Sequence, residues 1–149
     1  MSNTEVMTEI TQLTVQHIAV CYPTKSLNGQ VAQWAEGHDD CRIEPVFARS
    51  AMAIRRSLDN ADLALVDASD DHEQAIDLYS QAVAQLGARK ASVYTERMHE
   101  GLEHFVRTHG SWLLLGPLTD RQWDDYFAAM LPAANSKPSE RRASWRRAA

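Results

Sequence analysis

Five short stretches of the chain are rich in apolar residues, some of them in continuous runs, and polar or turn-forming residues close the clearest of these. Such runs are typical of strands that are buried on both faces of a parallel sheet. The clearest run extends from Leu63 to Val66 and stops at Asp67, which is followed by small and acidic residues. The predicted strands lie at residues 15–22, 42–47, 91–95 and 112–115 and within the stretch 61–71.

The segments between these runs carry apolar residues three and four positions apart, the spacing of helices that bury one face. Ser50 can cap the second helix, and Asp70, three residues before Glu73, resembles a capping signal for the third. Glycines at positions 37, 87 and 110 and Pro132 mark helix ends. The apolar sets are Leu27, Val31, Trp34 and Ala35; Ile54 and Leu58; Ile76, Tyr79, Val83 and Leu86; Leu102, Phe105 and Val106; and Trp123, Phe127, Met130 and Leu131.

Strict alternation of strands and helices predicts an α/β fold, a parallel sheet with helices on both faces. For five strands, the flavodoxin-like doubly wound sandwich in the order 2-1-3-4-5 is the natural candidate. This order puts the second strand at an edge, where Pro45 is tolerated because an edge strand can lack one hydrogen-bond donor. An antiparallel pairing among the first four strands would contradict this prediction.

In this topology a ligand crevice lies at the carboxyl ends of the first and third strands. The segments 22–26, 67–71 and 95–97 are predicted to rim it. Asp67 would then stand at the carboxyl end of the central strand, where open α/β sheets place their ligands. A simpler role for Asp67 is a turn residue that caps nearby amides, and Thr95 is equally compatible with a strand-end hydroxyl.

Composition and charge favour one domain at residues 14–132, between a flexible segment 1–13 and a disordered basic tail 133–149. The chain before Ala133 has ten basic and 19 acidic residues, hence −9, whereas the tail has five basic and one acidic residue, hence +4. The acidic body argues against nucleic-acid binding. No apolar run could span a membrane and no signal segment is evident, so we expect a cytoplasmic protein whose Cys21 and Cys41 are reduced.

Three motifs resemble those of response-regulator receiver domains, and the resemblance extends from about Val15 to Leu131. Residues 62–67, Asp-Leu-Ala-Leu-Val-Asp, resemble the receiver strand that ends in the phosphate-accepting aspartate. Residues 93–95, Val-Tyr-Thr, resemble the strand end whose hydroxyl contacts the phosphoryl group. Residues 114–118, Leu-Leu-Gly-Pro-Leu, resemble the motif that carries a lysine before proline in the family. The resemblance therefore implies that Asp67 is the equivalent of the phosphoacceptor.

The chain departs from the family pattern at the residues that neutralise phosphate. Receivers carry an acidic metal-binding pair after the first strand, but the corresponding residues here are Cys21 and Tyr22, or Tyr22 and Pro23. Gly116 stands at the position of the lysine. Only Asp67 and Thr95 remain, so the resemblance implies a degenerate receiver, because phosphoryl transfer depends on charge neutralisation by a metal and by cations.

Substitute binding groups are few. Asp70 and Asp71 are weak candidates for metal ligands, and we favour the alternative that they begin a helix, where acidic side chains interact well with the helix dipole. The six histidines show no convincing metal spacing. The loop 22–29 has a faint similarity to the hydroxyl-rich loop with which flavodoxins hold flavin phosphate, but Ser26 can also be a helix cap.

We therefore predict a non-enzymatic, non-phosphorylatable protein-interaction module in signal transduction, of the two-component type and without a cofactor. The alternatives are a flavodoxin-like phosphate- or flavin-binding protein and an active receiver with an atypical site at Asp67. The resemblance also implies homodimerisation through the fourth helix, fifth strand and fifth helix. In the fifth helix Trp123 and Phe127 are expected to face the core, and Tyr126 to be partly exposed at the contact. The basic tail is either a solvated extension or an interaction arm.

Overall fold

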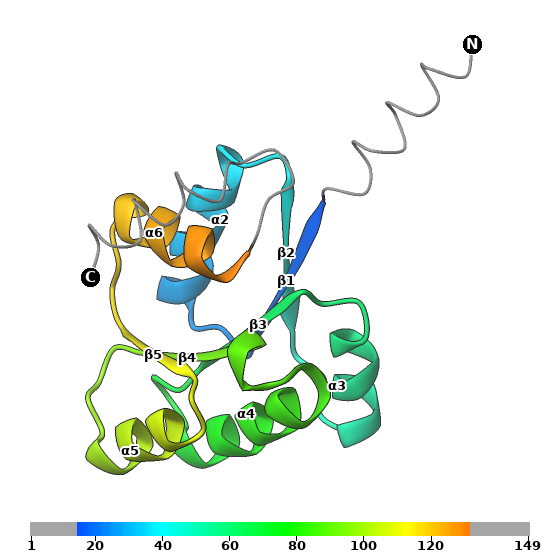
Figure 1. The fold of residues 1–149 in the computed structure, drawn as a ribbon, viewed down its shortest axis with the longest axis vertical. Helices are drawn as coiled ribbons and strands as arrows, with labels where there is room; N and C mark the ends of the chain where they lie inside the picture. The colour runs from blue at the N-terminus through cyan, green and yellow to red at the C-terminus, as the bar shows by residue number, and fades with distance from the viewer. Residues whose placement is uncertain (1–14, 132–149) are drawn as a thin grey trace.

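The computed structural model describes residues 15–131, which form a five-stranded parallel sheet flanked by helices (Figure 1). The strand order is β2-β1-β3-β4-β5, and every neighbouring pair is parallel, so the predicted topology is confirmed. The predicted segment 1–13 and basic tail 133–149 lie outside the described residues. The strands are β1 (Gln16–Cys21), β2 (Cys41–Val46), β3 (Leu63–Asp67), β4 (Ala91–Thr95) and β5 (Trp112–Leu115).

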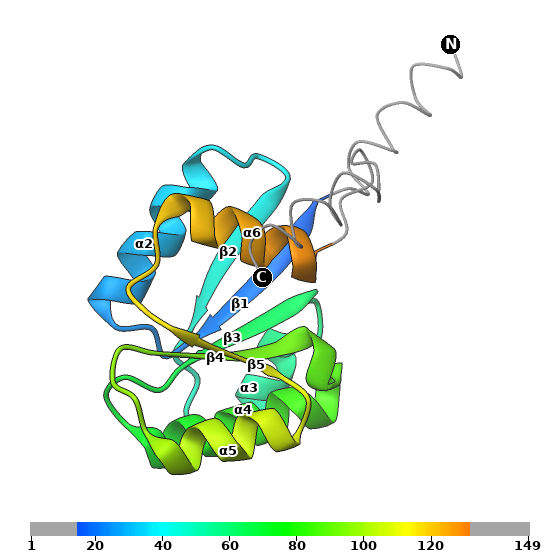
Figure 2. The same cartoon turned by 60° about the vertical axis from the view of Figure 1, so that its left-hand side comes forward.

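The helices form two layers that cover opposite faces of the sheet. Figures 1 and 2 show α3, α4 and α5 on one face and α2 and α6 on the other. The bounds are α2 (Lys25–Glu36), α3 (Ala51–Leu58), α4 (His72–Leu86), α5 (Glu100–Thr108) and α6 (Asp120–Met130), and a 3-10 turn, η1 (Ala88–Lys90), precedes β4.

The strand residues alternate between the two layers. Ile18 and Val20 pack in one apolar cluster with Trp34 of α2, whereas Ala19 and Cys21 pack in the other with Leu58 of α3. All five residues of β3 are buried, as expected for the central strand of a sheet that is covered on both faces. At the edge, β2 carries Pro45 opposite Val20, in the predicted position.

Two predicted helix caps are wrong by one or two positions. Ser50 caps α3 as predicted, with its side chain accepting from the Ala53 amide. For α2, however, the cap is Thr24 rather than Ser26, and for α4 it is Asp71 rather than Asp70. Thr24 and Asp71 have the extended backbone of a cap, and their side chains accept from the amides of Leu27 and Gln74, whereas Ser26 already lies inside α2.

The buried face of α4 also differs from the predicted one. Tyr79 is buried as predicted, but the other buried residues are Ala75, Leu78 and Ala82, and the predicted Ile76, Val83 and Leu86 are only partly buried. The observed stripe is therefore displaced around the helix from the predicted one, and it includes two alanines beside Leu78 and Tyr79.

The fifth predicted helix, α6, buries Trp123 and Phe127 as predicted, but the expectation for Tyr126 is wrong. Its side chain is only 3% exposed, and its ring contacts those of Trp112, Trp123 and Phe127. Burial raises the pKa of the Tyr126 phenol above its ordinary value. Tyr126 therefore stabilises the core and cannot act as an exposed contact for a partner.

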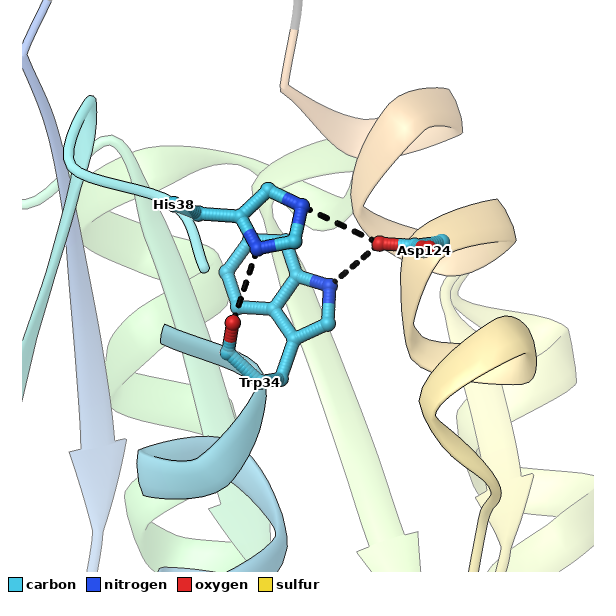
Figure 3. A network of polar contacts seen from close by, with 3 residues as sticks. All are labelled: Trp34, His38 and Asp124. Carbon is cyan, nitrogen blue, oxygen red and sulfur yellow. Dashed lines mark hydrogen bonds and ion pairs between the residues drawn. The ribbon is translucent and has the colours of Figure 1, made fainter. Parts of the chain in front are cut away.

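A polar network joins α6 to the end of α2 (Figure 3). The indole N–H of Trp34 donates to Asp124 Oδ1 at 2.7 Å, and His38 Nε2 lies 3.1 Å from the same oxygen. His38 also stacks on the Trp34 ring, with centroids 3.9 Å apart, and its Nδ1 lies 2.7 Å from the Trp34 carbonyl oxygen. The network therefore fixes the angle at which the two helices cover the sheet.

Replacing Asp124 with alanine should lower the free energy of unfolding by about 1–2 kcal/mol, because it leaves the buried indole N–H of Trp34 without an acceptor. Asp124→Asn keeps an oxygen beside the indole and should lose less. Urea denaturation of both variants measures the difference. Equal losses in the two variants would show that the negative charge, and not the acceptor, stabilises this contact.

Candidate functional site

Asp67 lies where the sequence places it, at the carboxyl end of β3, but the residue is only 5% exposed. Oδ2 accepts hydrogen bonds from the amide and the hydroxyl of Thr24, at 2.8 and 2.9 Å. Oδ1 accepts from the Ser69 amide at 2.9 Å. Three donors from the chain itself therefore occupy the two oxygens, which matches the alternative interpretation of Asp67 as a residue that caps nearby amides.

Thr24 connects Asp67 to the start of α2. Its hydroxyl donates to Asp67 and at the same time accepts from the Leu27 amide at 3.2 Å, which caps the helix. The loop between β1 and α2 is thereby tied to the end of the central strand. These bonds argue against the flavin alternative. The Thr24 hydroxyl belongs to the loop that would hold a flavin phosphate, and it is already bonded within the chain.

Cys21 and Tyr22, which stand at the position of the receiver acidic pair, make contacts away from Asp67. Cys21 is fully buried, and burial raises the pKa of its thiol to about 12, so it is neutral at pH 7. Tyr22 has a left-handed backbone, with φ of 49°, and its hydroxyl lies 2.8 Å from the Ala48 carbonyl oxygen and 3.1 Å from that of Phe47. Tyr22 thus fastens the loop before α3 and offers no ligand to a metal beside Asp67.

Thr95 is also engaged by its own turn. The side chain is fully buried, and its hydroxyl donates to the Arg97 carbonyl at 2.9 Å and accepts from the Arg97 amide at 3.2 Å. Next to it, the Glu96 amide donates to the Ser69 hydroxyl at 3.1 Å. The predicted rim segments 22–26, 67–71 and 95–97 therefore do meet at one edge of the sheet, and they meet through hydrogen bonds to one another.

Gly116 borders the buried ring of Tyr94. A Cβ atom built on Gly116 would overlap the Cε2, Cζ and Oη atoms of Tyr94, closer than real side chains approach. The hydroxyl of Tyr94 donates to Glu96 at 2.5 Å and accepts from the Gln30 amide group at 2.8 Å. The ring of Tyr94 thus occupies space that any side chain at position 116, including a lysine, would need at its first carbon.

Gln30 completes this arrangement, which we call the Tyr94 cluster: Gln30, Tyr94, Glu96 and Trp123. The side-chain oxygen of Gln30 accepts from the Leu118 amide at 2.9 Å and from the indole N–H of Trp123 at 3.2 Å. Burial, and then the bond to Glu96, raise the pKa of Tyr94 to about 12. Hydrogen bonds from Ser26 and Tyr94 lower the pKa of Glu96. Within the cluster, Tyr94 is therefore a neutral phenol and Glu96 a carboxylate at pH 7.

The acidic residues after Asp67 do not assemble a metal site. Asp71 is the cap of α4, since its side chain accepts from the Gln74 amide at 3.0 Å, and Asp70 is exposed. Over residues 15–131, no group of three or more histidine, cysteine, aspartate or glutamate side chains is arranged to hold a metal ion. In the same residues, no helix has both the length and the apolar composition needed to cross a membrane.

Sequence reasoning missed the importance of Thr24, Gln30 and Tyr94. Thr24 has a detectable signal, a hydroxyl three residues before the first buried residue of a helix, which is the spacing of a cap. Gln30 and Tyr94 have none, because the bond between them joins residues 64 positions apart, and the other partners of Gln30, Leu118 and Trp123, lie further away still. Only the folded arrangement reveals that position 116 must lack a side chain.

No family model and no curated protein sequence matches the chain. Several solved structures are similar to it, and two of them illustrate the likeness. A Burkholderia pseudomallei protein described as pilus assembly-related has 21% identity and a TM-score of 0.58, over 83% of this chain and 96% of that one. A Sinorhizobium meliloti protein described as the pilus assembly protein CpaE2 has 17% identity and a TM-score of 0.51, over 76% and 95%. At such identities the likeness concerns the fold, which is receiver-like and flavodoxin-like.

Proposed function

We propose that this chain is a pseudo-receiver: a receiver-like domain that does not take phosphate and acts as a protein-interaction module in signalling. The observation that carries the proposal is the bonding of Asp67. Its oxygens accept from Thr24 and Ser69, and the residue is 5% exposed. An attacking oxygen must be accessible and in line with the transferring group, whereas each oxygen of the buried Asp67 already accepts at least one hydrogen bond from the chain itself.

The surroundings of Asp67 support the same proposal. Transfer of a phosphoryl group brings negative oxygens together, and catalysis depends on a metal and on cationic side chains that neutralise them. The buried thiol of Cys21 and the hydroxyl of Tyr22 provide no carboxylate for a metal. Tyr94 fills the space beside Gly116, so a cation cannot be placed there without moving the ring.

The remaining parts of the proposal concern its setting. We propose that the module is not an enzyme, binds no cofactor, and meets its protein partners in the cytoplasm. The fold is shared with two proteins that are described as pilus assembly proteins. That likeness makes an assembly or signalling complex of this kind a reasonable first place to seek partners.

Homodimerisation through α5, β5 and α6 stays a prediction in modified form. Tyr126 is buried and cannot form the contact, but Leu115 at the end of β5 is 48% exposed. An apolar residue at the end of an edge strand is a better candidate for such a contact than a residue that is packed in the core.

Acetyl phosphate with magnesium should leave the full chain unmodified, as measured by intact-mass analysis, because the site lacks carboxylate metal ligands and a cation, and the carboxylate of Asp67 is buried and bonded within the chain. A phosphorylatable receiver in the same reaction shows that the donor is active. A phosphate-sized gain of mass that disappears in Asp67→Asn would contradict the proposal and support the active-receiver alternative, with Asp70 and Asp71 as the first residues to test for metal binding.

A further inference from the structure

Two adjoining hollows lie between α3 and α4, on the helical layer that Figures 1 and 2 show below the sheet. The first has a volume of about 550 Å³ and the second about 490 Å³, and Gln81 lines both. We call them together the α3–α4 groove. The first hollow is lined by Ala51, Met52, Arg55, Gln81, Ala84 and Gln85.

Hydrogen bonds hold the groove open in a defined shape. The side-chain amide of Gln81 donates to the Ala51 carbonyl at 2.7 Å. That of Gln85 donates to the Arg55 carbonyl and to an oxygen of Asp59, both at 2.7 Å. These bonds fix α3 against α4 at both ends of α3. A ligand would therefore meet a preformed surface, and binding would lose little conformational entropy in the protein.

The exposed apolar side chains at the groove have no role in the core. Met52 is 66% exposed, whereas its neighbours Ile54 and Leu58 are buried against the sheet. Phe47, on the loop before α3, is 59% exposed and touches the ring of Tyr22, which lines the second hollow. Methionine adapts its shape to different apolar partners, which makes it common at binding surfaces.

The charge of this region is opposite to that of the domain. Residues 15–131 include ten basic and 17 acidic residues, but the stretch 47–58 has three arginines and no acidic residue. Asp59 follows this stretch directly, and its carboxylate accepts from the Gln85 side chain at the end of the groove. Within residues 15–131, Arg49, Arg55 and Arg56 form no ion pair with an acidic side chain. Asp77 lines only the second hollow, so the first is the more basic of the two. Unpaired arginines beside exposed apolar side chains are typical of surfaces that bind a partner.

We propose that the α3–α4 groove binds an acidic amphipathic helix of a protein partner. The apolar side chains of that helix would enter the hollows beside Met52, and its carboxylates would pair with Arg55 of the first hollow and Arg49 of the second. This mode of recognition is common for helices that lie in apolar grooves. The +4 charge of the chain's own tail argues against the tail as occupant. The inference rests on the proposed interaction role, but it concerns a surface away from Asp67.

A fluorescent synthetic peptide of about five helical turns tests the proposal. Leucines at positions i, i+3, i+4 and i+7 of the peptide form its apolar face, and glutamates occupy the other positions. A matched peptide has lysines in place of the glutamates. Fluorescence anisotropy with the full chain should show binding of the acidic peptide, weakened by salt, and much weaker binding of the basic one.

Variants locate the site. Met52→Glu and Arg55→Glu should each weaken binding of the acidic peptide about tenfold or more, since both residues would lie at the centre of the contact. Arg121→Glu, which makes the same charge change at an exposed position of α6, should change the Kd less than about twofold. Circular dichroism checks that each variant is folded, and Met52→Ser and Arg55→Gln provide milder replacements should either glutamate variant unfold.

Several results would overturn the proposal. These are no binding of the acidic peptide, equal binding of the basic peptide, or equal losses in Arg55→Glu and Arg121→Glu. A concentration-dependent dimer that Met52→Glu dissociates, or peptide binding that appears only after removal of residues 1–14, would assign the groove to this chain itself. Because acetyl phosphate tests Asp67 and the peptide tests the groove, failure of one experiment is distinguishable from failure of the other.

Discussion

Replacing Gly116 with alanine should destabilise the protein by about 2–4 kcal/mol, although the change adds a single methyl group. The methyl carbon would overlap the ring and hydroxyl of Tyr94. The ring has little room to move, since it is fully buried, is stacked near Trp123, and bonds to Gln30 and Glu96. Moving the Tyr94 ring to relieve the overlap would therefore break its buried hydrogen bonds and also disturb its packing against Trp123.

Gly29→Ala is the matched control for this substitution. Gly29 is exposed within α2, and a Cβ there would meet no atom within 4 Å. Alanine is a better helix former than glycine, so this variant should gain about 0.5–1 kcal/mol. Urea denaturation measures both variants. If Gly116→Ala proved as stable as the unmodified chain, Tyr94 would be free to move, and a lysine at position 116 could be accommodated after all.

Most of the fold follows from local patterns that the sequence displays directly. The continuous run from Leu63 to Val66 marks a strand that is buried on both faces, and Pro45 marks an edge strand. Strict alternation of strands and helices then leaves few arrangements, because parallel strands need crossover connections. The position of Asp67 follows from the same reasoning, since it is the residue at which the central apolar run stops.

The missed details depend on geometry that a linear pattern does not contain. Thr24 and Ser26 both satisfy the composition rule for a cap, and only the backbone conformation selects Thr24. Tyr126 is three residues after Trp123, so both lie on one helical stripe, and the width of the buried stripe depends on the neighbouring β5 and its Trp112. The overlap between Tyr94 and position 116 is a contact between distant residues, which no local rule predicts.

The bonding of Asp67 leads to the second large effect. Asp67→Ala should lower the free energy of unfolding by about 2–4 kcal/mol, because it removes the shared acceptor of the Thr24 amide, the Thr24 hydroxyl and the Ser69 amide. The loop that caps α2 would lose its tie to the central strand. Asp70→Ala, an exposed aspartate three positions away, should change stability by less than about 0.5 kcal/mol.

Comparison of these two variants by urea denaturation tests most directly whether Asp67 is a structural acceptor or a phosphoacceptor. A carboxylate kept free for phosphate has few bonds to lose, and its removal costs little or even relieves repulsion between neighbouring acids. We predict a large loss of stability for Asp67→Ala and almost none for Asp70→Ala. An Asp67→Ala variant that is as stable as the unmodified chain, or more stable, would contradict the pseudo-receiver account.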